Sequence, residues 1–134
     1  MWFPDTNVCI MHSRGHAQVC GRWRQHRASD VAIPLTVYAE LLVGAEKSSQ
    51  TLRVLREIEA LLEAHEVIEI TEDVAEHYAR IRAELETRGA GIGSNDLWIA
   101  ATATAIAHDA TLVANNTAEF SRVPGLKIED WSGT

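Results

Sequence analysis

The stretch SNDLWIAATATAIAHDATLVA, residues 94–114, predicts a helix that leads directly into a strand, and this pairing decides the fold class. We expect Ser94 to cap the helix, which covers residues 95–107, because a serine hydroxyl accepts a hydrogen bond from the first turn. The alanines after Trp98 allow close packing against a sheet, and we expect Trp98 itself to pack in the core. Thr111–Ala114 supplies the strand. A helix followed by a buried strand is a repeating unit of α/β proteins.

The same alternation extends in both directions along the chain. Pro4 marks the end of the first strand, because proline cannot donate to a strand ladder, and Thr71 is the predicted N-cap of its helix. The expected strands cover residues 1–5, 31–33, 67–70, 111–114 and 126–128, and the expected helices cover residues 6–11, 17–27, 35–48, 52–62, 71–85 and 95–107. This order favours an α/β fold, a three-layer sandwich in which helices flank a mostly parallel central sheet.

Length and composition indicate one globular domain that covers residues 1–134. Hydrophobic residues make up 46% of the chain and there are only three prolines, so the chain can form a core and has no linker-like tract. The apolar runs are too short to cross a bilayer, and the N-terminal MWFPD lacks the basic start and apolar stretch of a signal peptide. We therefore expect a cytoplasmic protein, with Cys9 and Cys20 reduced.

Four acidic residues stand where extended runs give way to turns or helices: Asp5, Glu40, Asp96 and Glu119. In an alternating strand and helix protein, the carboxyl ends of parallel strands gather at one edge of the sheet, so these residues can meet there. Carboxylates that meet repel one another unless a cation joins them. The layout predicts a site for a hard metal ion, Mg²⁺ or Mn²⁺. Each acid alone also has a structural explanation, such as Asp96 as a helix N-terminal acid.

The net charge of −7 is unusual for a protein that binds nucleic acid, but its distribution is uneven. Setting the four site acids aside changes the formal charge from −7 to −3. No acidic residue lies between Asp5 and Asp30, a segment that contains the cations and the aromatic residue that could contact RNA or a partner: Arg14, Arg22, Trp23, Arg24 and Arg27. Trp23 could stack on a base. The alternative is a solvated helix face or a contact with an acidic partner.

Several motifs occur in an order and spacing that carry a family resemblance. They are DTN at residues 5–7, AELLVGAEKS at 39–48, GIGSNDLWIAA at 91–101, LVANNTAEFSRVPGL at 112–126 and EDW at 129–131. With these segments the chain resembles the PIN-domain proteins, and more narrowly the VapC-type ribonuclease toxins of bacterial toxin–antitoxin pairs. Pro4 and Ser94 depart from the family pattern, which usually has an aliphatic residue and a proline at these positions.

The resemblance implies a Mg²⁺-dependent endoribonuclease that cleaves RNA, with tRNA as the favoured substrate, and inhibits translation. It also implies a VapB-type antitoxin as partner and a homodimer. Asp5, Glu40 and Asp96 would be metal ligands, and Glu119 is our choice for the fourth acid, with Asn116 as the competing position. Thr6 and Asn7 are expected to orient Asp5, and Ser94 could reach a phosphate.

Two other classes of protein are considered. An aspartyl-phosphate phosphatase requires a second aspartate two residues after the nucleophile, where this chain has Asn7. A catalytically silent interaction protein with the same fold remains the alternative to the enzyme. His12 and His16 have no third ligand nearby for zinc, and the glycines at 89, 91 and 93 lack the lysine of a phosphate-binding P-loop, so they indicate a flexible loop beside the site.

Overall fold

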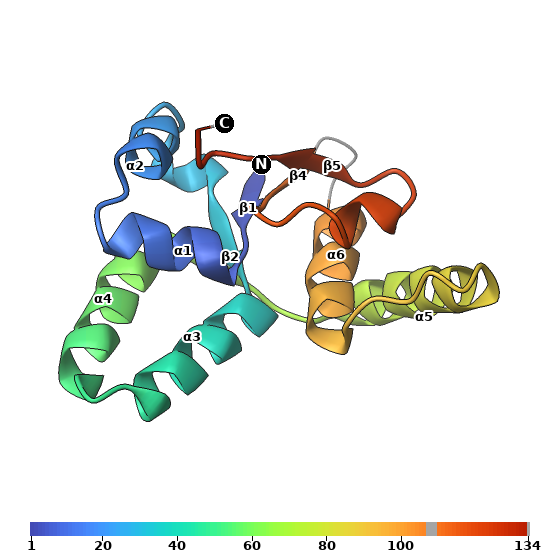
Figure 1. Ribbon diagram of the computed structural model, residues 1–134, viewed down its shortest axis with the longest axis horizontal. Coiled ribbons are helices and arrows are strands. Elements are labelled where there is room, and N and C mark those ends of the chain that lie inside the picture. The colour runs from blue at the N-terminus through green and yellow to red at the C-terminus, as the bar shows by residue number, and fades with distance from the viewer. Residues whose placement is uncertain (107–109, 134) are drawn as a thin grey trace.

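Parallel strands form the centre of the protein, and helices surround them (Figure 1). The structure is a computed structural model that describes residues 1–106 and 110–133. Within these residues the strands are β1 (Trp2–Pro4), β2 (Ala32–Pro34), β3 (Glu66–Ile68), β4 (Thr111–Val113) and β5 (Lys127–Glu129). The helices are α1 (Thr6–Ser13), α2 (Ala17–Trp23), α3 (Leu35–Lys47), α4 (Thr51–Ala64), α5 (Glu72–Thr87) and α6 (Ser94–Ile106), with 3-10 turns η1 (Ala28–Asp30) and η2 (Phe120–Arg122).

β1 and β4 lie side by side at the switch point of the sheet. The strands β2 and β3 follow β1 on one side of this point, and β4 and β5 lie on the other side. One sheet has the order β1-β4-β5 and the other pairs β2 with β3, and all of these pairs are parallel. A single parallel bridge between Trp2 and Val31 joins the two sheets. The combined order is therefore β3-β2-β1-β4-β5. In open α/β sheets, ligands bind at such a switch point, beyond the carboxyl ends of the strands.

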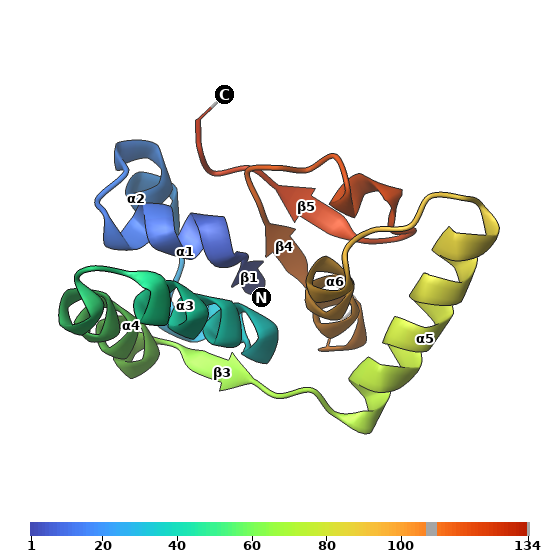
Figure 2. The same cartoon turned by 60° about the horizontal axis from the view of Figure 1, so that its bottom comes forward.

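Helices cover the strands from two sides. The helices α1 to α4 gather on one side of the strands, and α5 and α6 pack against each other on the other side (Figures 1 and 2). This arrangement confirms the predicted α/β fold with a parallel sheet flanked by helices. None of the helices in the described ranges combines the length and the apolar character that a membrane crossing requires.

Fully buried side chains fix the strands that lead into the switch point. Phe3 in β1 and Leu112 in β4 are paired neighbours, and both have 0% exposure. Burial of one such side chain contributes roughly 1.5–3 kcal/mol. The backbone N–H of Asp5 donates to the Val113 carbonyl at 2.9 Å, so the ladder continues into the residue that follows β1. The position of Asp5 is thus set by the core.

Several element boundaries differ from the predictions. The helix predicted over residues 17–27 ends at Trp23, and η1 follows it. Ser94 does not cap α6 but is its first residue, because the Leu97 N–H bonds to the Gly93 carbonyl and so gives Gly93 the preceding position. Thr71 is confirmed as the N-cap of α5, since its hydroxyl accepts from the Val74 N–H at 3.3 Å. The predicted end of the last helix, at residue 107, lies outside the described residues.

Aromatic packing ties the C-terminal segment to α2. Trp131 is fully buried, lies edge-on to Trp23 with ring centroids 6.0 Å apart, and stacks on His26 at 4.9 Å. On the other side of the strands, Trp98 is half-buried and stacks on Tyr78 at 3.8 Å. The expectation that Trp98 packs with the core is confirmed.

Candidate active site

Asp5 lies where β1 ends, and its carboxylate caps α1. The Oδ1 atom of Asp5 accepts a hydrogen bond from the Val8 N–H at 3.0 Å, and the residue is only 8% exposed. Burial raises the pKa of Asp5 from 3.8 to about 6; the bond from Val8 opposes this rise, whereas the charges of Glu40 and Asp130 add to it. Asp5 is therefore a buried acid whose ionised form is destabilised in the metal-free protein.

Glu40 on α3 is held by neutral donors from two other helices. Its Oε1 accepts from the Thr6 hydroxyl at 2.7 Å, and its Oε2 accepts from the Asn95 side-chain amide at 3.3 Å. The expectation that Thr6 orients Asp5 is wrong, because the crossing of α1 and α3 points the hydroxyl at Glu40. Asn7 is exposed on α1, so its role stays a prediction. Both oxygens of Glu40 are thereby fixed in place.

Asp96 and Glu119 form a carboxyl pair. Asp96 lies in the first turn of α6, and Glu119 directly precedes η2. Burial, followed by a hydrogen bond with Glu119, raises the pKa of Asp96 from 3.8 to about 7, and the charges of Glu119, Glu40 and Asp5 act in the same direction. The two carboxyl groups are thus close enough to share a proton. These mutual effects show that the fold brings all four predicted acids into one electrostatic neighbourhood.

The donor chemistry of this neighbourhood fits a hard divalent cation. Carboxylate oxygens are the ligands that Mg²⁺ and Mn²⁺ prefer, and a nearby cation favours the ionised forms that burial and crowding here disfavour. Within the described residues, however, no three acidic, histidine or cysteine side chains already surround one ion position. Asp5 and Asp96, with Glu40 and Glu119 beside them, are the residues that would hold a cation.

The remaining predicted site positions are less closely engaged. Asn116 is exposed in the turn after β4, and Ser94 is exposed at the start of α6. Glu119, unlike Asn116, contacts another acid of the site. That contact favours Glu119 as the fourth acid, although the assignment stays a prediction.

Sequence reasoning missed two residues beside the site. Asn95 contacts Glu40, and Asp130 raises the pKa of Asp5 through its charge. The available signals were weak: Asn95 directly precedes a predicted ligand, and Asp130 follows the last predicted strand.

The segment between Asp5 and Asp30 is partly committed to the core. Trp23 is 5% exposed, its Nε1 donates to His65 Nε2 at 3.2 Å, and its ring stacks on His12 at 3.9 Å. The expectation that Trp23 stacks on a base is therefore wrong. Arg22 lies 3.5 Å from the Glu129 carboxylate. The exposed cations of this segment, for which RNA or partner contact stays a prediction, are Arg14, Arg24 and Arg27.

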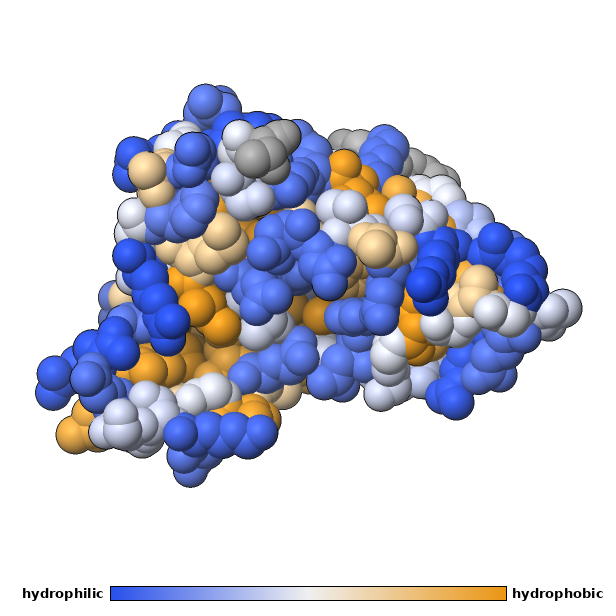
Figure 3. Space-filling model, in the orientation of Figure 1, coloured by the Kyte–Doolittle hydropathy of each residue, from blue (hydrophilic) through white to orange (hydrophobic). Residues whose placement is uncertain are grey.

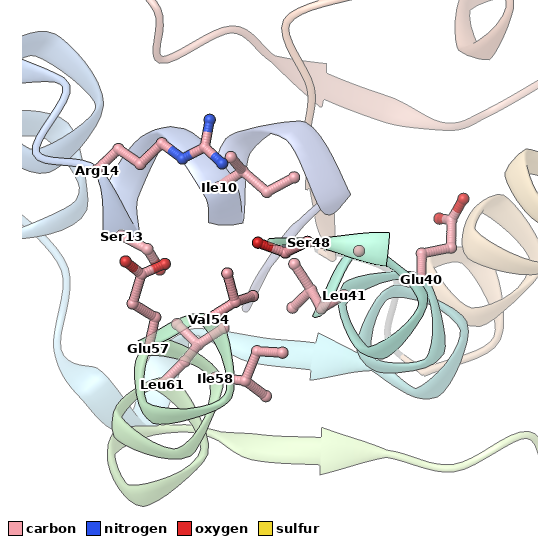
Figure 4. Close-up of a pocket in the computed structure, with 11 residues that line it drawn as sticks. Ile10, Ser13, Arg14, Glu40, Leu41, Ser48, Val54, Glu57, Ile58 and Leu61 are labelled. Atoms are coloured by element: carbon pink, nitrogen blue, oxygen red, sulfur yellow. The ribbon is translucent and has the colours of Figure 1, made fainter. Parts of the chain in front are cut away.

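An apolar groove runs beside the acids, between α1, α3 and α4. Figure 3 shows hydrophobic residues gathered in a hollow over this side of the molecule. The groove has a volume of about 90 Å³, and its apolar lining residues are Ile10, Leu41, Val54, Ile58 and Leu61. Glu40 lies at one end, and Arg14 and Glu57 lie at the other (Figure 4). One wall of the groove is therefore continuous with the acid site.

The fold and the acid site define a known class of protein. The PIN domain pattern matches residues 2–126, and the chain belongs to the PIN-domain family. The chain is 36% identical over 133 residues to ribonuclease VapC2 of Rickettsia felis, which covers 98% of each chain. It is 35% identical over 127 residues to the tRNA(fMet)-specific endonuclease VapC of Salmonella typhimurium, which covers 95% of each.

A solved structure gives the same result at the level of the fold. The chain superposes with a TM-score of 0.89 and 34% identity on a chain of the DNA-bound VapBC complex from Salmonella typhimurium, with 97% of each chain covered. Within the PIN-domain family the chain is thus a nuclease of the VapC type. Nucleases of this type generally depend on a divalent metal ion.

Proposed function

We propose that this protein is the toxin of a toxin–antitoxin pair: a Mg²⁺-dependent endoribonuclease that hydrolyses tRNA and thereby inhibits translation. The observation that carries the proposal is the meeting of four acids from four distant segments at the switch point of the sheet: Asp5, Glu40, Asp96 and Glu119. No side-chain nucleophile is required for hydrolysis of a phosphodiester by activated water.

The acidic residues of the site have different proposed roles in metal binding and in positioning the attacking water. A bound divalent cation would acidify a water molecule and offset charge on the phosphodiester. Asp5 and Asp96 would hold the cation through carboxylate oxygens. Glu40 keeps a fixed orientation because Thr6 and Asn95 hold both of its oxygens. Glu119, which is hydrogen-bonded to Asp96, would position the attacking water.

The proposed substrate and partner follow from the relatives. The Salmonella typhimurium relative is named a tRNA(fMet)-specific endonuclease, which supports tRNA as the substrate. Solved relatives are VapBC toxin–antitoxin complexes, which supports a VapB-type antitoxin as the partner. The apolar groove that ends at Glu40 offers an apolar segment of that antitoxin a surface next to the acids. Since tRNA and translation are cytoplasmic, the toxin acts in the cytoplasm.

We also propose a homodimer. Val43 and Ile70, with exposures of 50% and 37%, border the same surface hollow together with Leu35 and Ala39. An exposed apolar patch of this kind is a candidate protein interface. Light scattering after size-exclusion chromatography should give twice the mass of one chain, and a monomer at micromolar concentration would contradict this part of the proposal.

The enzyme is tested by sequencing RNA ends after brief expression of the protein. We expect new 5′ ends at one position of a tRNA, and their loss in Asp5→Asn and Asp96→Asn with an unchanged circular dichroism spectrum. Asp73→Asn, at an exposed position on α5, is the matched control and should retain cleavage. If no RNA is cleaved in cells or by the purified protein with Mg²⁺, the fold serves only as an interaction module.

A further inference from the structure

Two arginine side chains fasten the segments that carry Asp96 and Glu119. Arg122 Nη1 donates to the Gly91 carbonyl at 3.0 Å, and Arg88 Nη2 donates to the Arg122 carbonyl at 2.8 Å. In the described part of the chain, these are the arginines whose guanidinium groups donate to backbone carbonyls. Figure 2 shows η2, which ends at Arg122, beside the loop that joins α5 to α6. The guanidinium group of Arg122 is therefore held at a defined place.

That place is next to the acid site. The Arg122 N–H bonds to the Glu119 carbonyl at 3.1 Å, so one short turn separates the arginine from the acid. Gly91, which accepts from the Arg122 side chain, lies in the loop that leads into the first turn of α6, where Asp96 is located. Because Asp96 and Glu119 contact each other, Arg122 fastens the two backbone segments that carry this acid pair.

The charge of Arg122 is not neutralised by a carboxylate. Among the residues that the structure describes, ion pairs involve Arg22, Arg53, Arg82 and Arg88, and not Arg122. A guanidinium group has five N–H donors, and the bond to Gly91 leaves most of them free. A planar arginine held in place matches the two oxygens of a phosphate and loses little side-chain freedom when it binds.

We propose that Arg122 binds a phosphate of the RNA backbone beside the cleaved bond, with Arg88 as the positioning residue that holds its turn. This inference rests on the proposed ribonuclease function. It assigns the Arg122 guanidinium group as a positive charge that contacts the RNA backbone. A strongly acidic site in a chain of net charge −7 repels RNA, and a cation without a carboxylate partner on the turn that follows Glu119 offsets that repulsion.

The competing explanation is that Arg122 only stabilises the loop at residues 88–93 and does not contact RNA. The two roles differ in their dependence on salt. Each phosphate contact with single-stranded RNA contributes about 0.7 to the slope of log affinity against log salt concentration. An arginine that only stabilises the loop and touches no phosphate contributes nothing to that slope, even if its replacement lowers the affinity for RNA.

The experiment measures binding of a fluorescent tRNA(fMet) transcript to the Asp5→Asn protein, which binds without cleaving, by anisotropy at several KCl concentrations. We expect Arg122→Gln in this background to weaken binding about tenfold at low salt and to reduce the slope by about 0.7. Arg122→Lys keeps a cation and should retain most of the slope. Arg80→Gln, an exposed arginine on α5, is the matched control and should change neither quantity.

Each outcome separates the two proposals. If Arg122→Gln and Arg122→Lys lower affinity equally with an unchanged slope, or if neither alters binding, Arg122 does not contact phosphate and the inference is wrong. If the Asp5→Asn protein with intact Arg122 binds no tRNA at all, the proposed substrate class is wrong, and the phosphate contact is lost with it. A lower melting temperature in Arg122→Gln together with an unchanged salt slope would show that Arg122 only stabilises the loop.

Discussion

Replacement of Asp5 by asparagine should stabilise the metal-free protein while it removes a metal ligand. Asp5 is 8% exposed, and its pKa is raised from 3.8 to about 6, chiefly by burial. A rise of about two pKa units corresponds to roughly 3 kcal/mol, at about 1.4 kcal/mol per unit. Asparagine has the same shape, and its Oδ1 can still accept the hydrogen bond that Val8 donates to Asp5. The variant therefore loses the buried charge and keeps the helix cap.

The sign of the pH dependence follows from the direction of the shift. The folded protein holds a proton on Asp5 between pH 3.8 and about 6, whereas the unfolded chain releases it. The contribution of Asp5 to the wild-type free energy of unfolding consequently falls as pH rises through this window and is flat above it. Asparagine does not titrate, so the difference between variant and wild type should be close to zero at pH 4 and up to about 3 kcal/mol at pH 8.

The assay is urea unfolding in EDTA at both pH values, followed by circular dichroism. Asp73→Asn, an exposed change on α5, is the control and should alter stability by less than about 1 kcal/mol at either pH. In a further arm, Mg²⁺ replaces EDTA at pH 8, and it should stabilise the wild type more than Asp5→Asn. A variant that is less stable than the wild type at pH 8 in EDTA, or an equal difference at both pH values, would refute the reasoning.

Three further predictions concern the site and the groove. Glu119→Gln should reduce the initial rate of tRNA cleavage about 100-fold. Asn116→Ala should reduce this rate less than about fivefold, because only Glu119 contacts Asp96. Equal losses of rate in the two variants would reject Glu119 as the fourth acid. Asn95→Ala should weaken Mn²⁺ binding about tenfold in calorimetry, because the change removes the hydrogen bond to Glu40 Oε2. Gln25→Ala, at an exposed position, is the control and should leave the affinity unchanged. Unaltered Mn²⁺ binding in both variants would show that Asn95 does not position Glu40. Val54→Glu should weaken antitoxin binding at least tenfold with a similar melting temperature, since the groove is apolar; undiminished binding would exclude the groove.

The strands and most helices were predictable because their signals are local. Alternating strand and helix patterns, Thr71 as a cap and Pro4 at a strand end each depend on a few neighbouring residues. The failure at Ser94 is also local: the backbone carbonyl of Gly93 began the helix one residue earlier than a side-chain cap would. Such errors move a boundary and leave the fold class unchanged.

Trp23 shows where local reasoning ends. Its arginine neighbours suggested a ring that could stack on a base, yet it packs against His65 and against Trp131 near the other end of the chain. The burial of an aromatic ring depends on what the rest of the chain brings to it, which no window of sequence around Trp23 contains. Of the cations beside it, Arg14, Arg24 and Arg27 are exposed, and their contact with RNA or a partner stays a prediction.

The sequence by itself determined the α/β class and the family, and it singled out the four acids as candidates, because residues near the carboxyl edge of a parallel sheet can meet there. Only the tertiary structure decided how the acids are held. Glu40 is fixed by donors 34 and 55 residues away, and Asp96 is hydrogen-bonded to Glu119, whereas Asp5 acts on Asp96 only through its charge. These partners depend on how helices cross and how closely carboxylates approach in a buried site, and crossing geometry has no signal in residue spacing.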